Sequence, residues 1–373
     1  MNSVGCNWID FAEAVVDRTG GHPRVQRGSV LEAGDIPVID QGESFTAGFT
    51  LRSNRYQGSL PVVLFGDHTR RVKYVDFEFA IGADGVKVLE PRPGLDAKYL
   101  YFYLRSLRIP NSGYSRHFKF LREFRVPMSA PAEQQRTVDF LTRAEGIVRL
   151  RREAQRKAAE LIPAIFIDMF GDPSMNPKGW PTASLGELLA APIRNGTSPS
   201  RAGRHAGHVL TLSAITRGRF DPKAMKESTF AAPLAPHDAV SMDDFLICRG
   251  NGNSNLVGTG CFPTADMPTV AFPDTAIAVR PDRTRLNHAY LSAYWKTGHA
   301  RAAINRIAKT TNGTFKINQT GVTGLSIPLP PLIQQSAFAD IAARMESVEQ
   351  QQSAALTTAQ ATFNALLAQA FTR

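Results

Sequence analysis

Planar amide and guanidinium side chains gather in two separate parts of this 373-residue chain. Arginine can donate a pair of hydrogen bonds to guanine, asparagine and glutamine can pair with adenine, and lysine can bind phosphates. The candidates in the first half are Gln41, Arg52, Asn54, Arg55, Tyr114, Arg116, His117 and Lys119. Those in the second half are Arg249, Asn251, Asn253, Asn255, Lys309, Thr311, Asn312 and Lys316. Residue type alone leaves open which of them would contact a base, a phosphate or neither.

The charge of the chain favours an anionic partner, either nucleic acid or an acidic membrane surface. It holds 43 Lys and Arg against 33 Asp and Glu, a net charge of +10. The stretch from Arg105 to Arg125 contains one acid, Glu123, and the stretch from Arg301 to Lys316 contains none. Because this charge recurs in both halves, we expect contact with DNA phosphates, weakening steeply with salt. An ordinary solvated basic face is the alternative.

Motifs for catalysis are absent from the sequence. There is no Gly-x-x-x-x-Gly-Lys-Ser/Thr loop for ATP, no His-Glu-x-x-His, no Gly-x-Ser-x-Gly and no Asn-Pro-Pro-Tyr/Phe run typical of amino-group DNA methyltransferases. Asp67-His68 is interpreted as a structural turn rather than a catalytic pair. Asp243-Asp244 is interpreted as the lead-in to a buried strand rather than a metal pair. The sequence therefore predicts a protein that is not itself an enzyme and binds no metal or cofactor.

The cysteines and the lengths of the apolar segments indicate the cellular compartment of the protein. Cys6, Cys248 and Cys261 form no Cys-x-x-Cys pair, which is typical of free thiols in a reducing cytoplasm. No run of eighteen apolar residues is present, and the first residues lack the pattern of a signal peptide. We expect a cytoplasmic protein without a membrane-spanning segment.

A repeat at a spacing of 201 residues indicates how these candidates are positioned. Val126-Pro127 recurs as Ile327-Pro328, Gln134 as Gln335 and Phe170 as Phe371, with no gap. Apolar residues alternate four and three apart behind each anchor, which predicts two long helices packed along one stripe. The first seam reads Phe140, Ala144, Ile147, Arg151, Ala154, Ala158, Leu161 and Ile165. The second reads Ile341, Met345, Val348, Gln352, Ala355, Ala359, Thr362 and Leu366.

A globular head precedes each predicted helix. We divide the chain into a first head over 1–128, a central helix over 129–172, a second head over 173–328 and a C-terminal helix over 329–373. The heads share features near their ends: Tyr99-Leu100 and Tyr103 parallel Tyr290-Leu291 and Tyr294, and Phe118-Lys119 parallels Phe315-Lys316. If the helices pack antiparallel, the polar seam positions Arg151 and Gln352 should meet at the crossing. A solvent-exposed Arg151 is the alternative.

Several motifs, in this order along the whole chain, resemble the specificity (S) subunits of type I restriction–modification systems. Ile327–Leu332 followed by Gln334-Gln335 is similar to the proline-rich lead-in to that family's helices. Ile165–Pro173, continuing to Trp180, resembles the junction between the central helix and the second recognition domain. Framework segments of the two domains are similar to Phe65–Arg70, Tyr114–Leu121, Leu246–Asn251 and Leu256–Gly258.

The resemblance implies an α+β fold: two similar target-recognition domains separated by two long antiparallel helices, related as a pseudo-two-fold repeat. It implies that each domain reads one half of a gapped DNA site. Partners would be double-stranded DNA, two modification (methyltransferase) subunits carrying S-adenosylmethionine, and restriction (motor–nuclease) subunits carrying ATP and Mg²⁺. The competing hypothesis is a coiled-coil scaffold whose heads bind proteins.

Overall fold

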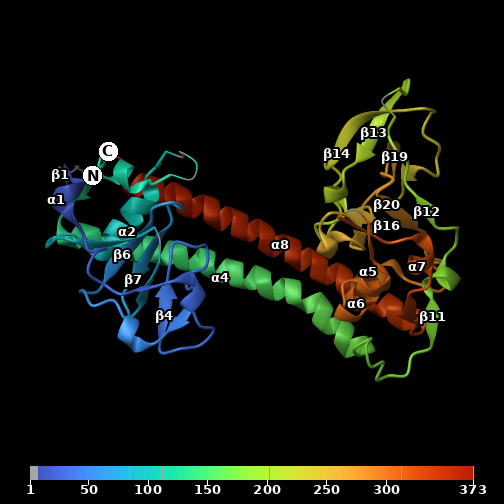
Figure 1. Cartoon of the computed structure of the whole chain (residues 1–373), viewed down its shortest axis with the longest axis horizontal. Helices are drawn as coiled ribbons and strands as arrows, with labels where there is room; N and C mark the ends of the chain where they lie inside the picture. Colours follow the sequence, from blue (N-terminus) through green and yellow to red (C-terminus); the bar gives the residue numbers. More distant parts are fainter. Residues whose placement is uncertain are drawn as a thin grey trace. The chain divides into compact units, whose positions relative to one another are not determined.

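Two compact units make up the chain, and each long helix contributes one half to each unit. A computed structural model describes residues 7–83, 85–110, 113, 115–200, 202–311 and 313–372 (Figure 1). The first unit comprises Met1–Ala154 and Ser353–Arg373, and the second comprises Gln155–Gln352. Within the described ranges, no helix combines the length and apolar character needed to cross a membrane.

The two predicted long helices are confirmed. Helix α4 covers Pro131–Phe170 and helix α8 covers Leu332–Ala370. In the first unit, Leu141 and Val148 from the first half of α4 pack with Phe363 and Leu367 from the second half of α8. In the second unit, the roles are exchanged: the end of α4 packs with the start of α8 through Phe166, Phe170, Phe338 and Ala342. The helices are therefore antiparallel in both units.

The predicted seam is wrong for Phe140, Ile147 and Leu161, whose side chains are 53%, 54% and 39% exposed. The buried stripe of α4 in the first unit lies one residue further on, at Leu141 and Val148. Phe102 from the head packs into the same cluster, so this face of α4 must meet both α8 and the head. One residue rotates a helix face by about 100°.

Among the remaining seam positions, Ala158 is buried, as predicted, and Thr362 is exposed. Arg151 is exposed, in agreement with the alternative given above. The half-buried seam positions are Ala144, Ala154, Ile165, Ile341, Met345, Val348, Gln352, Ala355, Ala359 and Leu366.

The head of the first unit is built on two four-stranded sheets, ordered β2-β9-β6-β7 and β3-β8-β4-β5, and a two-stranded pair, β1-β10 (Figure 1). Its strands are β1 (Asn7–Asp10), β2 (Val15–Asp17), β3 (Arg24–Val25), β4 (Ile36–Ile39), β5 (Gly48–Thr50), β6 (Val62–Gly66), β7 (Val72–Val75), β8 (Ala80–Gly82), β9 (Val86–Pro91) and β10 (Arg125–Met128). Its helices are α1 (Phe11–Ala14), η1 (Arg27–Ser29), η2 (Arg52–Asn54), α2 (Ala97–Ser106) and α3 (Phe118–Leu121).

The head of the second unit has sheets ordered β12-β20-β16-β18, β14-β13-β19-β15 and β17-β22-β21, and the pair β11-β23. Its strands are β11 (Thr182–Ser184), β12 (Arg194–Asn195), β13 (His205–Leu210), β14 (Met225–Phe230), β15 (Ala239–Val240), β16 (Phe245–Cys248), β17 (Gly250–Asn251), β18 (Gly260–Cys261), β19 (Met267–Ala271), β20 (Ala276–Val279), β21 (Lys309–Thr311), β22 (Thr314–Lys316) and β23 (Ser326–Pro328). Its helices are η3 (Leu185–Leu188), η4 (Leu212–Ala214), η5 (Ser254–Leu256), α5 (His288–Trp295), α6 (Gly298–Ile307) and α7 (Gln319–Thr323).

The sheets of the two heads correspond in part. In β2-β9-β6-β7 and in β12-β20-β16-β18 every neighbouring pair is antiparallel. In the other large sheets, β4 and β8 pair in parallel as β13 and β19 do, with an antiparallel strand beside β4 and beside β13. The far edges differ, because β3 is parallel to β8 whereas β15 is antiparallel to β19. The fully buried strands β6 and β16 lie at the same place in this plan, and the loop after β16 carries the candidate residues Arg249, Asn251 and Asn253.

A buried glutamine ties each head to the helix that follows it. Gln134 accepts a hydrogen bond from the N–H of Asp96, the N-cap of α2, at 2.8 Å, and donates to two backbone carbonyls at 2.8 Å. Gln335 accepts from the N–H of Asn287, the N-cap of α5, at 2.8 Å and also donates to two carbonyls. A buried amide that satisfies three backbone groups fixes the start of the long helix against the head.

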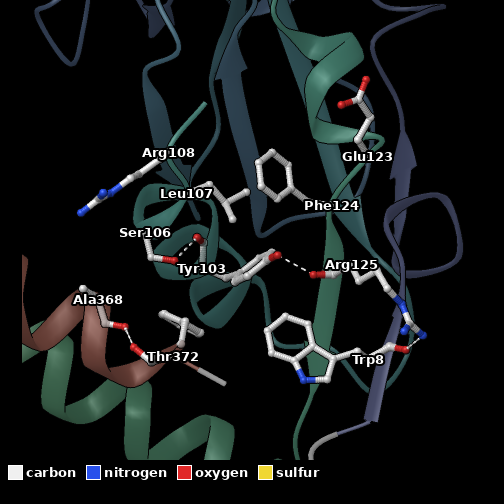
Figure 2. A pocket seen from close by; sticks show the side chains of 11 residues that line it. Trp8, Tyr103, Ser106, Leu107, Arg108, Glu123, Phe124, Arg125, Ala368 and Thr372 are labelled. Carbon is white, nitrogen blue, oxygen red and sulfur yellow. Dashed lines mark hydrogen bonds between the residues drawn. The ribbon is translucent and has the colours of Figure 1, made fainter. Parts of the chain in front are cut away.

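Tyrosine hydroxyls make the second repeated contact. Tyr103 of α2 donates to the carbonyl of Arg125 on β10, and Tyr294 of α5 donates to the carbonyl of Ser326 on β23 at 2.8 Å. Figure 2 shows the Tyr103 contact in a pocket that is also lined by Trp8, by Ala368 of the last turn of α8 and by Thr372, which follows that helix. The recurrence of Tyr103 as Tyr294 therefore reflects one shared structural role.

Candidate nucleic-acid interface

In the first unit, the loop after β6 is held by the segment that leads into α3. The N–H of His117 donates to the carbonyl of Asp67 at 2.8 Å, and Nδ1 of the same histidine lies 2.9 Å from that oxygen. The Asp67 carboxylate accepts from the N–H of Phe118 at 2.7 Å. Asp67 is therefore a structural residue, as predicted. His117 is only 1% exposed, so its prediction as a DNA contact is wrong: packing under the loop, rather than charge, explains its place.

The second unit repeats this connection. The N–H of Ile317 donates to the carbonyl of Arg249, the first residue after β16, at 2.9 Å. His117 and Ile317 thus correspond, and the residues before them, Arg116 and Lys316, are both exposed cations. The predicted parallel of Phe118-Lys119 with Phe315-Lys316 is therefore wrong, since the first pair opens helix α3 and the second lies on β22.

The three-stranded sheet of the second unit gathers candidates that lie about sixty residues apart. Gly250 pairs with Lys316, and Lys316 pairs in turn with Lys309. Both lysines are exposed, and like charges directly opposite each other destabilise a strand pair. An anion bound over the sheet would remove that repulsion, which makes this surface suited to a phosphate backbone.

Asparagines shape the loop beside this sheet. The side-chain carbonyl of Asn251 accepts from the N–H of Asn253 at 2.9 Å, and that of Asn253 accepts from the N–H of Asn255 at 3.0 Å. Within the described ranges, the side-chain amide nitrogens of Asn251 and Asn253 donate no hydrogen bond, since both of these contacts use the side-chain oxygens. These donors are directed by a preformed loop, which lowers the entropy cost of binding.

Arg301 and Trp295 of the neighbouring helices hold the end of the same loop in place. Arg301 donates to the carbonyl of Val257 at 2.7 Å, and the indole N–H of Trp295 donates to the carbonyl of Gly258 at 2.7 Å. Burial lowers the pKa of Arg301 from its usual value. Charge counting placed Arg301 in a basic patch and gave no sign of this role. Arg249 is partly committed as well, donating to the carbonyl of Asp274 at 3.3 Å.

The remaining candidates of the first unit are partly engaged within the head. Gln41 accepts from the N–H of His68 at 3.1 Å and so joins the loop after β4 to the turn after β6. Arg52 and Arg55 flank one carboxylate, Glu78, at 3.4 and 3.2 Å. Both guanidiniums are exposed, so these ion pairs contribute little and can exchange for a phosphate.

Four further candidates complete the comparison with the sequence. Asn54 donates to the hydroxyl of Thr50 at 2.9 Å. Lys119 is exposed and its ammonium lies 5.0 Å from the ring centre of Phe120. Tyr114 and Asn312 lie outside the described residues.

Carboxylates and thiols form no metal site in the described ranges: no three His, Cys, Asp or Glu side chains converge. Asp244 is fully buried and paired with Arg280 at 2.9 Å, so it is a structural anchor before β16. Cys248 and Cys261 are free and buried, and burial raises the pKa of each thiol to about 11. Cys6 lies outside the described residues.

Two curated proteins share sequence with part of this chain. The specificity subunit of the type I restriction enzyme StySPI from Salmonella potsdam is 32% identical over 133 residues, which are 35% of this chain and 29% of that protein. The specificity subunit of EcoR124I/EcoR124II from Escherichia coli is 27% identical over 111 residues, 29% of this chain and 28% of that protein. The chain thus matches less than a third of the length of either relative. No protein-family model matches it.

Solved structures match over the full length. A type I restriction–modification S subunit from M. genitalium superposes with a TM-score of 0.60 at 14% identity, covering 100% of this chain and 98% of that one. A chain from a structure describing complex assembly and conformational transition of the type I restriction–modification system gives 0.57 at 16% identity, with coverages of 100% and 98%. These matches confirm the predicted fold class and, with the curated relatives, the resemblance to type I specificity subunits.

Proposed function

We propose that this chain is the DNA-recognition (specificity) subunit of a type I restriction–modification complex. Each head reads one half of a gapped, bipartite DNA site, and the long helices dock two modification subunits. S-adenosylmethionine is bound by those subunits, and ATP and Mg²⁺ by the restriction subunits. The complex works on DNA in the cytoplasm.

The observation that carries this proposal is the correspondence of Arg116 and Lys316. Each is an exposed cation immediately before the residue that bonds to the loop after the central buried strand. A duplicated framework that presents a cation at the same place in both heads suits a ligand with a repeated anionic backbone. The relatives' designation as specificity subunits supports the same reading.

Exposed apolar side chains on α4 support the docking of a partner protein. Phe140, Ile147 and Leu150 are 53%, 54% and 59% exposed in the first unit. Apolar side chains spaced three and seven apart form one stripe on a helix, and an exposed stripe is typical of a protein interface. We assign this stripe to the modification subunit.

The chain is proposed to carry no catalytic activity of its own. Its curated relatives are specificity subunits, and the sequence lacks the motifs that methyl transfer or ATP hydrolysis would require. Incubation of the purified chain with S-adenosylmethionine and DNA should yield no methylation. Turnover without a modification subunit would contradict this division of roles.

A salt titration tests the proposal against the scaffold hypothesis. The intact chain should bind random-sequence duplex, with an affinity that falls by about 10³-fold or more between roughly 50 and 200 mM salt if six or more phosphates are contacted. A scaffold whose heads bind proteins should show weak affinity and a shallow slope. Absence of salt-dependent binding to duplex would overturn the proposed function.

A further inference from the structure

A strongly basic groove lies in the first unit beside the head, where α2 ends and α4 passes. Its volume is about 650 Å³. Two carboxylates line it, those of Glu43 and Glu145. Its cationic side chains outnumber them three to one: Arg70, Arg71, Lys73, Arg105, Arg108 and Arg152.

Two of these cations, Lys73 and Arg70, are held in place by backbone carbonyls. Lys73 is only 7% exposed, and its ammonium donates to the carbonyls of Asp40, Ser44 and Phe45 at 2.7, 2.6 and 3.2 Å. The ammonium also forms an ion pair with the Asp40 carboxylate, at 3.7 Å. Arg70 donates to the carbonyl of Ile109 at 3.2 Å. Asp40 therefore offsets part of the charge of Lys73, whereas Arg70 has no ion pair in the described ranges and keeps its positive charge at the groove.

Two other cations are free to meet a ligand. Arg108 follows α2 and Arg152 lies on α4, and both are exposed. In the part of the chain that the structure describes, neither has a hydrogen bond or an ion pair. Arg71 reaches Glu43 at 3.5 Å, but both side chains are largely exposed, so this pair is weak. Arg105 is the exception, since it is committed to Glu145.

We propose that this groove is a sequence-independent binding site for the phosphate backbone of duplex DNA, separate from the residues that read bases. Arg70 supplies a fixed positive charge, Lys73 adds to it in part, and Arg108 and Arg152 contact phosphates. The groove is open rather than enclosed, which suits a continuous strand better than a small anion. The inference rests on the proposed function, because it assumes that the chain binds DNA.

The test compares two double variants of the intact chain that remove the same charge. R108A/R152A empties the groove of its unpaired cations. R92A/R143A removes two exposed arginines outside it; Arg143 lies nine residues from Arg152, on the opposite side of α4. Binding is measured by fluorescence anisotropy on random-sequence duplex and on a duplex selected by the wild-type chain, at several salt concentrations. Thermal unfolding establishes that both variants fold.

The groove variant should lower the slope of log affinity against log salt by about 2, one per lost phosphate contact. Its affinity should fall by the same factor on both duplexes, while the control variant retains the wild-type slope. Equal slopes for the two variants would overturn the groove assignment, and so would a changed preference between the duplexes. If the wild-type chain and the control fail to bind DNA, the proposed function fails instead. Unaltered DNA binding with weakened capture of a modification subunit would assign the groove to that protein and overturn the inference.

Discussion

The ring of Phe371, at the end of the chain, lies edge-on against Tyr99 of the first head, with 5.2 Å between ring centres. Phe170, 201 residues earlier, lies edge-on against Tyr290 of the second head at 4.9 Å. Each head therefore binds the end of a long helix that it does not itself precede. Together with Gln134 and Gln335, these aromatic contacts fix both helices to each head.

Replacing either phenylalanine with alanine should destabilise its unit. Phe170 is 3% exposed and Phe371 is half-buried, so we expect F170A to cost about 3–5 kcal/mol and F371A roughly 2 kcal/mol in the free energy of unfolding. Chemical denaturation measures both. F140A, at an exposed position of α4, serves as the control and should change stability by less than about 0.5 kcal/mol. A larger loss for F371A than for F170A would contradict this ranking.

The buried glutamines should be equally important in the two units. Q134L and Q335L each leave one N–H and two carbonyls without their partner, which should cost about 1–3 kcal/mol. Gln135, the neighbour of Gln134, is exposed and bonds to Asp139, so Q135L should be nearly neutral. Urea denaturation of the three variants measures these changes in the free energy of unfolding. A neutral Q335L would show that its three hydrogen bonds contribute nothing to stability.

An introduced carboxylate should destabilise the chain at Val148 and not at its neighbour Ile147 on α4. Val148 is 5% exposed within the helix pair, so V148D should cost more than about 3 kcal/mol. I147D should leave the melting temperature nearly unchanged and should weaken capture of a modification subunit, since Ile147 lies on the exposed stripe. A stable V148D chain would show that the seam is misplaced.

Stability should decrease in mild acid through His288. Burial lowers the pKa of this imidazole, with a further contribution from Arg283. The folded chain therefore binds fewer protons than the unfolded chain, and stability is lost as the pH falls through the usual histidine value of about 6.5. The His288 ring stacks on Phe262 at 4.0 Å, a contact that phenylalanine can keep. H288F should therefore unfold with a weaker pH dependence than the wild type, as judged by denaturation between about pH 7.5 and 5.5. An identical dependence would exclude His288 as the cause.

The sequence predicted the long helices well because periodic spacing depends only on neighbours along the helix. It misplaced their seam by one residue, because Phe102 of α2 packs into the helix pair and no local pattern reports that contact. The repeat identified Gln134 and Gln335 as equivalent, but their hydrogen bonds to the N-caps of α2 and α5 depend on tertiary structure.

The interface was predictable in composition but not in detail. Charge counting placed Arg116 and Lys316 among the candidates, and the fold shows that they correspond. The same counting included His117, which is buried, and treated Arg301 as a surface cation although it holds the loop of Asn255 and Val257. A sequence shows which side chains are cationic and not which of them are already engaged within the protein.

Selection from a random duplex library tests the central claim most directly. The intact wild-type chain should enrich sites with two specified blocks separated by an unspecified gap. R116A should relax one block and K316A the other, because each cation lies in a different head. Enrichment of a single contiguous motif, or loss of the same block in both variants, would contradict two equivalent DNA-reading heads.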